Sequence, residues 1–228
     1  MLVLSLDTTT RGGSVAVIEE HAVVTELVGD PSLTHGARLP LDLIRALHTA
    51  GRSVAELDLL AVAVGPGSFT GLRVGISAMQ GLAMAIGKRI VPVSTLDALA
   101  AAGAGGSLPV ATWMDAQRGE VFATIYDAAG MNPSVEPTAL SPDQTLDAWT
   151  RAGVAGPLRF IGDGAVRYAD VIHRRLGRDS EILAPPPLAP VIGRIAAAAP
   201  GRAVLPHAVV PLYVRRPDAE IAKAKTGV

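Results

Sequence analysis

The sequence predicts an α/β protein made of two α/β subdomains. Apolar, β-branched segments of strand length alternate with segments of helical periodicity along the chain. With 228 residues, of which 49% are hydrophobic and 18% charged, the chain has enough apolar material for a sizeable core. A glycine-rich stretch over residues 103–107 divides it. We therefore expect an N-terminal subdomain over residues 1–102 and a C-terminal subdomain over residues 103–228, with a last segment that can return to the first.

The N-terminal half opens with three strands, as its β-branched content and glycine punctuation indicate. A helix follows, and then a short turn marked by the capping box of Ser53 and Glu56. The run from Leu59 to Val64 is almost wholly apolar, which is typical of a central strand covered on both faces. We expect strands at 2–6, 14–18, 22–28, 59–64 and 90–93, and helices at 36–50, from the following glycine turn to 86, and at 95–102.

The second half is less regular. Two strands, 110–114 and 121–126, are expected to be joined through residues 115–120. The other expected elements are a helix at 142–149, a strand end and turn at 160–164, a helix at 166–176, a stiff proline spacer at 185–187, a helix at 191–199 and an extended tail at 209–216.

Charge and composition exclude several classes of protein. The net charge is −1, whereas a chain that binds nucleic acid alone usually carries an excess of clustered Lys and Arg. Any role on RNA therefore needs a basic partner. The absence of cysteine excludes disulfides and thiolate metal sites. No segment reads as a signal peptide, and the apolar stretch 57–64 is far shorter than the ~18 residues of a membrane helix. We expect a soluble, cytoplasmic protein without a membrane partner.

Two loops contain residue types that could bind a nucleotide. Residues 7–13 offer a carboxylate, three hydroxyls and two glycines, which suit a hydrated cation and phosphate oxygens, although an ordinary β-turn explains them too. Residues 65–71 form a glycine-rich turn before a helix, which suits an anion, but the spacing matches neither the dinucleotide fingerprint nor a P-loop. A tight strand-to-helix turn accounts for it equally well. The candidate nucleotide-binding residues are Asp7, Thr8, Thr9, Gly65, Gly67 and Ser68.

Other catalytic chemistry has little support. None of the five histidines lies three or four residues from another, so no helical metal pair exists. Ser68 is not in a G-x-S-x-G elbow, because Pro66 occupies the first glycine position. Asp115 and Glu120 flank a turn, where carboxylates routinely approach each other. We therefore expect neither catalytic residues nor a metal site.

The long helix after the glycine turn is more apolar than one sheet contact requires. Its polar residues form a narrow stripe, and Gly71 and Gly75 stand one turn apart on one face, where they could let another helix approach. The helix at 36–50 also has a broad apolar face. Apolar surface left over by these two helices would mark a protein interface, although full burial within the subdomain is the other reading. The candidate interface residues are Leu39, Leu43, Leu47, Gly71, Val74, Gly75, Ala78, Met79 and Leu82.

At this point the chain resembles a known family. The residues that carry the likeness are Asp7 to Thr10 with Ser14 to Val17, Gly65 to Gly75, Pro92 to Leu99, Asp115 to Val121 and Leu212 to Arg216. Together they resemble the TsaB proteins in order along nearly the whole chain, with residues 130–190 weakly matched. The resemblance implies the actin-like, ribonuclease H-like fold of acetate kinase, sugar kinases, Hsp70 and actin (ASKHA), with two related α/β subdomains around a cleft.

The resemblance also implies a role in tRNA modification. TsaB is the bacterial partner of TsaD, and the ATPase TsaE completes the set that places a threonylcarbamoyl group on N6 of adenosine 37 in tRNAs reading ANN codons. TsaD performs the transfer with a metal held by two histidines spaced H-x-x-x-H. Those positions fall here on Thr95 and Leu99, which cannot supply an imidazole. The chain is thus expected to be a non-catalytic subunit that binds and activates TsaD as a heterodimer, with tRNA bound through the complex and a homodimer allowed when alone.

A competing reading is an enzyme of the same fold, either an ATP-dependent phosphotransferase or a peptidase-like hydrolase. Asp7 and the glycine turn would then hold ATP or ADP with Mg²⁺. Such a kinase needs a further carboxylate and a second glycine-rich loop, for which Gly162-Asp163-Gly164 is the available candidate. A nicotinamide-dependent dehydrogenase is disfavoured, because the chain does not open with a βαβ unit and lacks the fingerprint.

Overall fold

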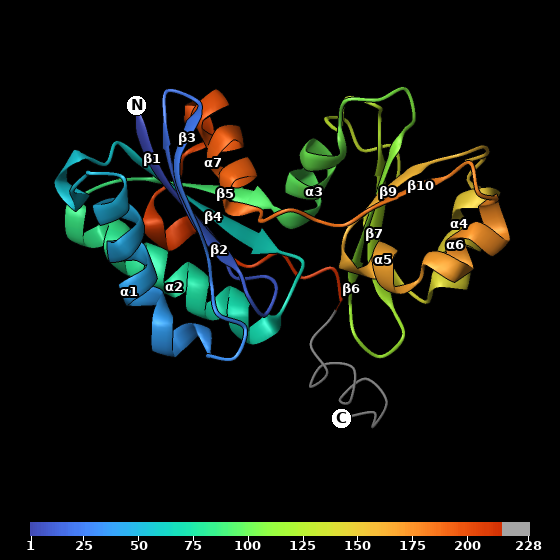
Figure 1. Cartoon of the computed structure of the whole chain (residues 1–228), viewed down its shortest axis with the longest axis horizontal. Helices are drawn as coiled ribbons and strands as arrows, with labels where there is room; N and C mark the ends of the chain where they lie inside the picture. The colour runs from blue at the N-terminus through green and yellow to red at the C-terminus, as the bar shows by residue number, and fades with distance from the viewer. Residues whose placement is uncertain (216–228) are drawn as a thin grey trace.

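Two five-stranded sheets lie side by side in the computed structural model, which describes residues 1–215 (Figure 1). In the first sheet the strand order is β3-β2-β1-β4-β5. The first three strands pair antiparallel, whereas β4 and β5 are parallel to β1. All side chains of β1 and β4 are buried, as expected for central strands covered on both faces. The strands are β1 (Leu2–Asp7), β2 (Ser14–Glu19), β3 (Ala22–Val28), β4 (Leu59–Gly65) and β5 (Ile90–Ser94).

The second sheet repeats the connectivity of the first. Its order is β10-β9-β6-β7-β8, with β6, β7 and β8 antiparallel and β9 and β10 parallel to β6. The strands are β6 (Val110–Asp115), β7 (Val121–Tyr126), β8 (Thr138–Leu140), β9 (Arg159–Ile161) and β10 (Glu181–Leu183). The expectation of two related α/β halves is therefore confirmed.

Helices cover both faces of the first sheet (Figure 1). Alternate residues along β1 contact different layers, because successive side chains of a strand point to opposite faces. Leu2, Leu4 and Leu6 share a core with α1 and α2, whereas Val3 shares one with α7. The remaining helices belong with the second sheet or lie between the sheets. The helices are α1 (His35–Thr49), α2 (Phe69–Ile86), α3 (Thr95–Gly103), α4 (Pro142–Arg151), α5 (Asp163–Arg167), α6 (Ala169–Leu176) and α7 (Ala189–Ala198), with short 3-10 turns at Val54–Glu56, Pro200–Arg202 and Pro206–Ala208.

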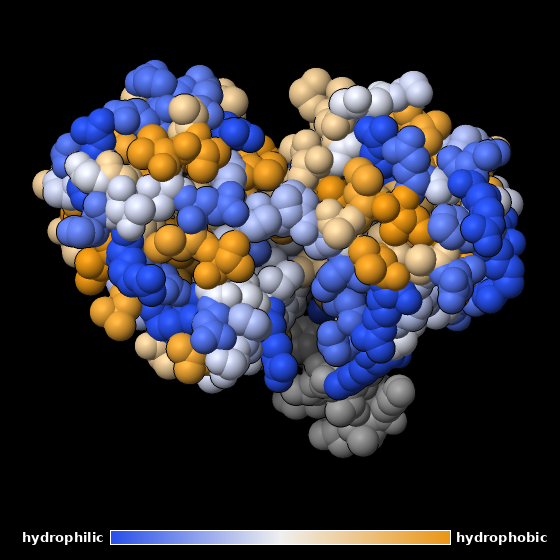
Figure 2. Space-filling view, viewed as in Figure 1, coloured by the Kyte–Doolittle hydropathy of each residue, from blue (hydrophilic) through white to orange (hydrophobic). Residues whose placement is uncertain are grey.

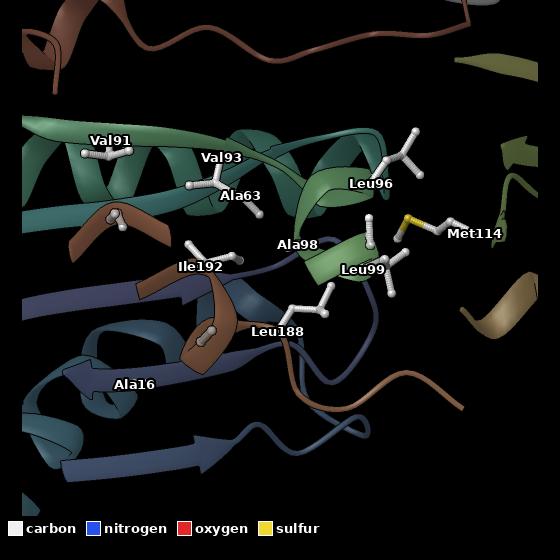
Figure 3. Close-up of a cluster of buried hydrophobic side chains, with 14 of the residues drawn as sticks. Ala16, Ala63, Val91, Val93, Leu96, Ala98, Leu99, Met114, Leu188 and Ile192 are labelled. Atoms are coloured by element: carbon white, nitrogen blue, oxygen red, sulfur yellow. The ribbon is translucent and has the colours of Figure 1, made fainter. Parts of the chain in front are cut away.

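One hydrophobic core runs through both subdomains. Leu96 and Leu99 on α3 lie between the first sheet and Met114 on β6, and Ile192 on α7 belongs to the same cluster. Figure 3 shows these side chains converging from α3, α7, β5 and the second subdomain. A separate cluster around Trp113, Trp149 and Phe160 fills the space between the second sheet and its outer helices.

Most expected elements are present, with the differences concentrated in the second half. The capping box of Ser53 and Glu56 forms and starts a 3-10 turn. The helix expected at 166–176 is broken at Tyr168 into α5 and α6, and the short strands β8 and β10 were not expected. Helix α7 packs on β1, β2 and β4 of the first sheet, so the chain has returned to the first subdomain by Ala189. Arg216 and the residues after it lie outside the described range.

Helix α2 is long and apolar enough to cross a membrane by length and composition alone. A core helix of a soluble protein passes the same test, and α2 buries Leu72, Ile76 and Met79 against the first sheet.

Candidate functional site

A cleft of about 1420 Å³ lies between the two subdomains. Its first wall comes from residues 9–11, 31–36 and the glycine turn, and its second wall from residues 114–118 and Phe122. Tyr213 and Arg215 line it as well. A smaller cavity of about 230 Å³, which contains both Asp7 and Asp163 in its lining, adjoins the same loops.

Asp7 ends β1, where the antiparallel and parallel parts of the first sheet meet. Its residue is 3% exposed, and Oδ1 accepts hydrogen bonds from Thr9 N (2.8 Å) and Thr9 Oγ1 (2.6 Å). Burial raises the pKa of Asp7, although the two bonds from Thr9 act in the opposite direction. Asp7 lines the smaller cavity.

The glycine turn packs directly on the Asp7 loop. Ser68 N donates to Thr9 O (2.9 Å), and a Cβ at Gly67 would lie 2.6 Å from Thr9 Cβ. Ser68 Oγ accepts from Gly71 N (3.2 Å) and caps α2. Thr9, Gly67 and Ser68 therefore line the large cleft, whereas Asp7 lines the smaller cavity beside it. Gly65 lies beside them with φ +113°, and a Cβ there would meet Leu212 O at 2.7 Å.

Thr8 points away from the cleft toward α2, which corrects two expectations. A Cβ at Gly71 would lie 2.1 Å from Thr8 O, and one at Gly75 would lie 2.1 Å from Thr8 Oγ1. The two glycines therefore accommodate the Asp7 loop within the subdomain and do not form an approach for an outside helix. Thr8 itself is 1% exposed, so its hydroxyl is not presented to a ligand in the cleft.

The predicted interface set separates into covered and accessible residues. Leu39, Leu43, Leu47 and Met79 are buried in the core between α1, α2 and the sheet, because the two helices turn these side chains toward each other and toward β1 and β4. They cannot contact a partner in this conformation. Val74, Ala78 and Leu82 remain partly exposed on α2.

Further apolar side chains on the same two helices are exposed and lie outside the candidate interface list. Ile44 is 60% exposed and Met84 70% exposed, and Leu41 and Phe69 are exposed as well. Figure 2 shows apolar surface interspersed with polar groups over the subdomain that carries α1 and α2.

A partly buried polar network joins α1 to the Asp7 loop. His35 Nε2 lies 2.9 Å from Thr10 O, and Arg38 Nη2 lies 2.9 Å from His35 Nδ1 and donates to Gly12 O. A carbonyl oxygen can only accept, so His35 carries its proton on Nε2 and accepts from Arg38 at Nδ1. Arg38 also pairs with Asp42 at 2.5 Å. Burial lowers the pKa of His35, and the nearby Arg38 acts in the same direction.

The opposite wall is the turn between β6 and β7. Gln117 and Arg118 both have left-handed backbones, with φ +59° and +58°, and Asp115 Oδ1 accepts from Gln117 N at 3.0 Å. Asp115 pairs with Arg167 (2.6 Å), whereas Glu120 pairs with Arg215 (2.5 Å). The two carboxylates are therefore engaged by different arginines and not by each other.

Asp163 begins α5 on the same side of the cleft. Its Oδ1 accepts from Asp115 N and from Gly164 N, both at 2.9 Å. Partial loss of hydration raises the pKa of Asp163, although the hydrogen bonds from Asp115 N and Gly164 N act in the opposite direction and the residue lines the cleft. Thr95 and Leu99, at the positions of the expected imidazoles, are both buried at the start and middle of α3. Within residues 1–215 no group of three or more His, Cys, Asp or Glu is arranged to hold a metal ion.

Comparison with known proteins gives consistent matches. Residues 31–155 match the family model described as TsaD, tRNA N6-adenosine threonylcarbamoyltransferase. The tRNA threonylcarbamoyladenosine biosynthesis protein TsaB of Escherichia coli is 32% identical over 81% of this chain and 82% of its own length. The protein of the same name from Bacillus subtilis is 27% identical over 78% of this chain and 77% of its length.

Solved structures match in the same way. YeaZ from Pseudomonas aeruginosa has a TM-score of 0.75 and 28% identity, with 93% of this chain and 99% of that one covered. Component A of the (R)-2-hydroxyglutaryl-CoA dehydratase of Acidaminococcus fermentans has a TM-score of 0.57 at 8% identity, covers 88% of this chain and 99% of its own, and shares the fold alone.

Proposed function

This chain belongs to the TsaB family, and from that premise we propose that it is the non-catalytic subunit that binds and activates TsaD. Family membership places it in the biosynthesis of threonylcarbamoyladenosine in tRNA, and its fold is the actin-like α/β fold. The pair would act at adenosine 37 of tRNAs that read ANN codons, in the cytoplasm, with TsaE as a further partner. TsaD would hold the reacting groups.

The observation that carries this proposal is the chemistry of α3. The resemblance assigns transfer to a metal held by two histidines, and the matching positions are Thr95 and Leu99. Leucine has no lone pair, and both side chains are buried in a hydrophobic core. The residues present at this place therefore do not fit a metal ion.

The accessible apolar residues of α1 and α2 support docking. Exposed apolar side chains grouped on neighbouring elements are typical of protein interfaces. We propose that Val74, Ala78 and Leu82 contact TsaD, together with the exposed Ile44 and Met84. The same face would serve a homodimer when the chain is alone. The net charge of −1 supports tRNA binding through the partners.

Docking is tested by charged substitutions on this face. Val74→Asp and Leu82→Asp should abolish co-purification with TsaD, because a carboxylate would have to be desolvated in the interface. Circular dichroism should show a folded monomer for both. The matched control is Val166→Asp, an exposed valine on α5 of the other subdomain, which should leave pairing unchanged. Met79 is unsuitable for this test, because it is fully buried. Pairing that survives both changes places the interface elsewhere.

Catalysis is tested with the purified chain alone. Incubated with threonylcarbamoyl-adenylate and tRNA, it should produce no modified adenosine, as measured by mass spectrometry of the digested nucleosides. Addition of TsaD and TsaE should restore modification. Product that increases with the concentration of this chain alone would overturn the assignment.

A second candidate function is ATP-dependent phosphotransfer. Asp7 and Asp163 line the same small cavity, which supplies the two carboxylates that such an enzyme needs. ATP or ADP with Mg²⁺ would contact Asp7, Thr9, Gly67 and Ser68, either weakly in the cleft or at a subunit interface. Thr8 would not take part, because it faces Gly75. Calorimetry with ATP and with ADP, each with and without Mg²⁺, tests this. Absence of heat in the free chain and in the TsaD complex removes the candidate.

A further inference from the structure

Residues 204–212 run along the first subdomain before the chain crosses the cleft. Val204 bridges to Ile90 at the edge of the first sheet. Gln80 Nε2 on α2 donates to Pro206 O (2.9 Å) and to Val209 O (3.0 Å), and Leu212 N donates to Val64 O (2.7 Å). Hydrogen bonds to α2 and β4 thus hold this segment on the first subdomain.

The side chain of Tyr213 contacts the first turns of α2. The ring of Tyr213 stacks on Phe69 with centroids 5.6 Å apart and planes inclined by 29°. Arg73 lies over the Phe69 ring, 3.9 Å from its centroid, and donates from Nε to Tyr213 Oη at 3.3 Å. Tyr213 is therefore held by both a ring contact and a hydrogen bond at the rim of the cleft.

Arg215 then binds the second subdomain. It donates to Ala116 O at 2.8 Å and pairs with Glu120 at 2.5 Å, both in the turn between β6 and β7. Its guanidinium also lies 5.7 Å from the centroid of the Phe122 ring. Val214, between the two anchors, packs against the core that spans both subdomains. Figure 1 shows this segment running from the end of β4 to β6.

We propose that residues 209–215 form a clasp that holds the two subdomains at one angle and so sets the width of the cleft. Within residues 1–215 the chain otherwise crosses between the sheets at residues 104–109 and 184–188. Two crossings define an axis about which the halves can rotate, as in hinge motions of two-lobed proteins. A third attachment away from that axis opposes the rotation. Tyr213 and Arg215 both line the cleft. Opening of the cleft would pull at least one of the two residues away from its partner on the opposite subdomain.

The inference concerns the isolated chain and does not rest on the proposed partner. It does bear on docking, because Phe69 and Arg73 belong to the helix whose exposed residues form the proposed interface. A protein bound at that end of α2 would meet the clasp directly.

The test measures the distance between the subdomains in the full chain. Because the sequence lacks cysteine, His48→Cys on α1 and Asp170→Cys on α6 provide unique sites for spin labels. Without further change we expect one narrow distance distribution. Tyr213→Ala and Arg215→Ala should make it roughly twofold broader or move it to longer distances, as release of a hinge predicts. The matched control is Arg194→Ala, which removes an arginine bound to His21 O on the first subdomain and should change nothing.

Distributions of Arg215→Ala and Tyr213→Ala that superimpose on the unchanged protein would overturn the clasp. Glu120→Gln removes the same ion pair from the other side and gives the test if Arg215→Ala does not fold. In that variant also, an unchanged distribution refutes the proposal, and a broadened one supports it.

Discussion

At the scale of single residues, Asp7 is a carboxyl group whose ionisation is less favourable in the folded chain than in the unfolded chain. Its carboxylate is buried, and burial raises its pKa above the usual 3.8. The folded chain therefore binds this proton more tightly than the unfolded chain does. The resulting stabilisation is complete below pH 3.8 and is lost as the pH rises through the folded pKa. At neutral pH an ionised Asp7 costs stability.

We therefore predict that Asp7→Asn stabilises the chain at pH 7. The amide keeps an oxygen that can accept the hydrogen bonds from Thr9 and removes the buried charge. The free energy of unfolding should rise at pH 7, because the folded chain no longer holds a buried, ionised carboxylate. Urea unfolding at pH 7 measures it, and the gain should shrink on acidification toward the raised pKa.

The control for this prediction is Asp30→Asn. Hydrogen bonds from Ser32 lower the pKa of Asp30, so loss of its charge should reduce stability, the opposite sign. A destabilised Asp7→Asn protein at pH 7 would show that the surroundings of Asp7 favour its ionised form.

At the scale of elements, α2 packs against the Asp7 loop only because Gly71 and Gly75 have no side chains. A Cβ at Gly75 would lie 2.1 Å from Thr8 Oγ1, and Thr8 is itself buried. We predict that Gly75→Ala destabilises the chain by about 1–3 kcal/mol, the usual cost of overpacking, despite the better helix propensity of alanine. Gly81 on the same helix has open space and provides the control.

Gly81→Ala should stabilise the chain by up to about 1 kcal/mol, because propensity acts there alone. Denaturant midpoints of the two variants measure the contrast. Equal shifts would mean that the Asp7 loop moves away from α2 at little cost.

Periodicity and capping signals were sufficient to predict the strands and helices of the first half, because each depends on nearby residues. The short strands β8 and β10 were missed, since three residues carry no periodic signal. The residues of the Asp7 loop and glycine turn were also predictable, as they follow strands that end at one edge. Their orientation was not: that Thr8 faces Gly75, and that Met79 faces the sheet, follows from tertiary packing which no local pattern records.

At the scale of the whole molecule, the core couples the two subdomains. The cluster around α3 contains residues of both sheets, so neither half can unfold without exposing apolar surface of the other. We predict a single cooperative unfolding transition. Trp113 and Trp149 are both in the second subdomain, so their fluorescence reports that half, whereas far-ultraviolet circular dichroism reports both.

Thermal or urea transitions followed by the two signals should coincide within error. A fluorescence transition that clearly precedes or follows the circular dichroism transition would show that the subdomains unfold independently. The Arg215→Ala protein provides a comparison, because it removes one link between the halves and leaves the shared core in place.

The repeated connectivity of the sheets gives α3 and α7 equivalent places, each after the fifth strand of its half. Helix α3 packs on β6 and β9 of the second sheet as well as on β4 and β5 of the first. Helix α7 packs on β1, β2 and β4 of the first sheet, where Ser5 and Ser14 hydrogen-bond to its first residue, Ala189. The final helix of each half thus packs on the sheet of the other half, as in a domain-swapped dimer, but within one polypeptide. Cutting the chain at residues 103–107 would therefore separate each sheet from a helix that packs on it, and neither fragment would contain a complete core.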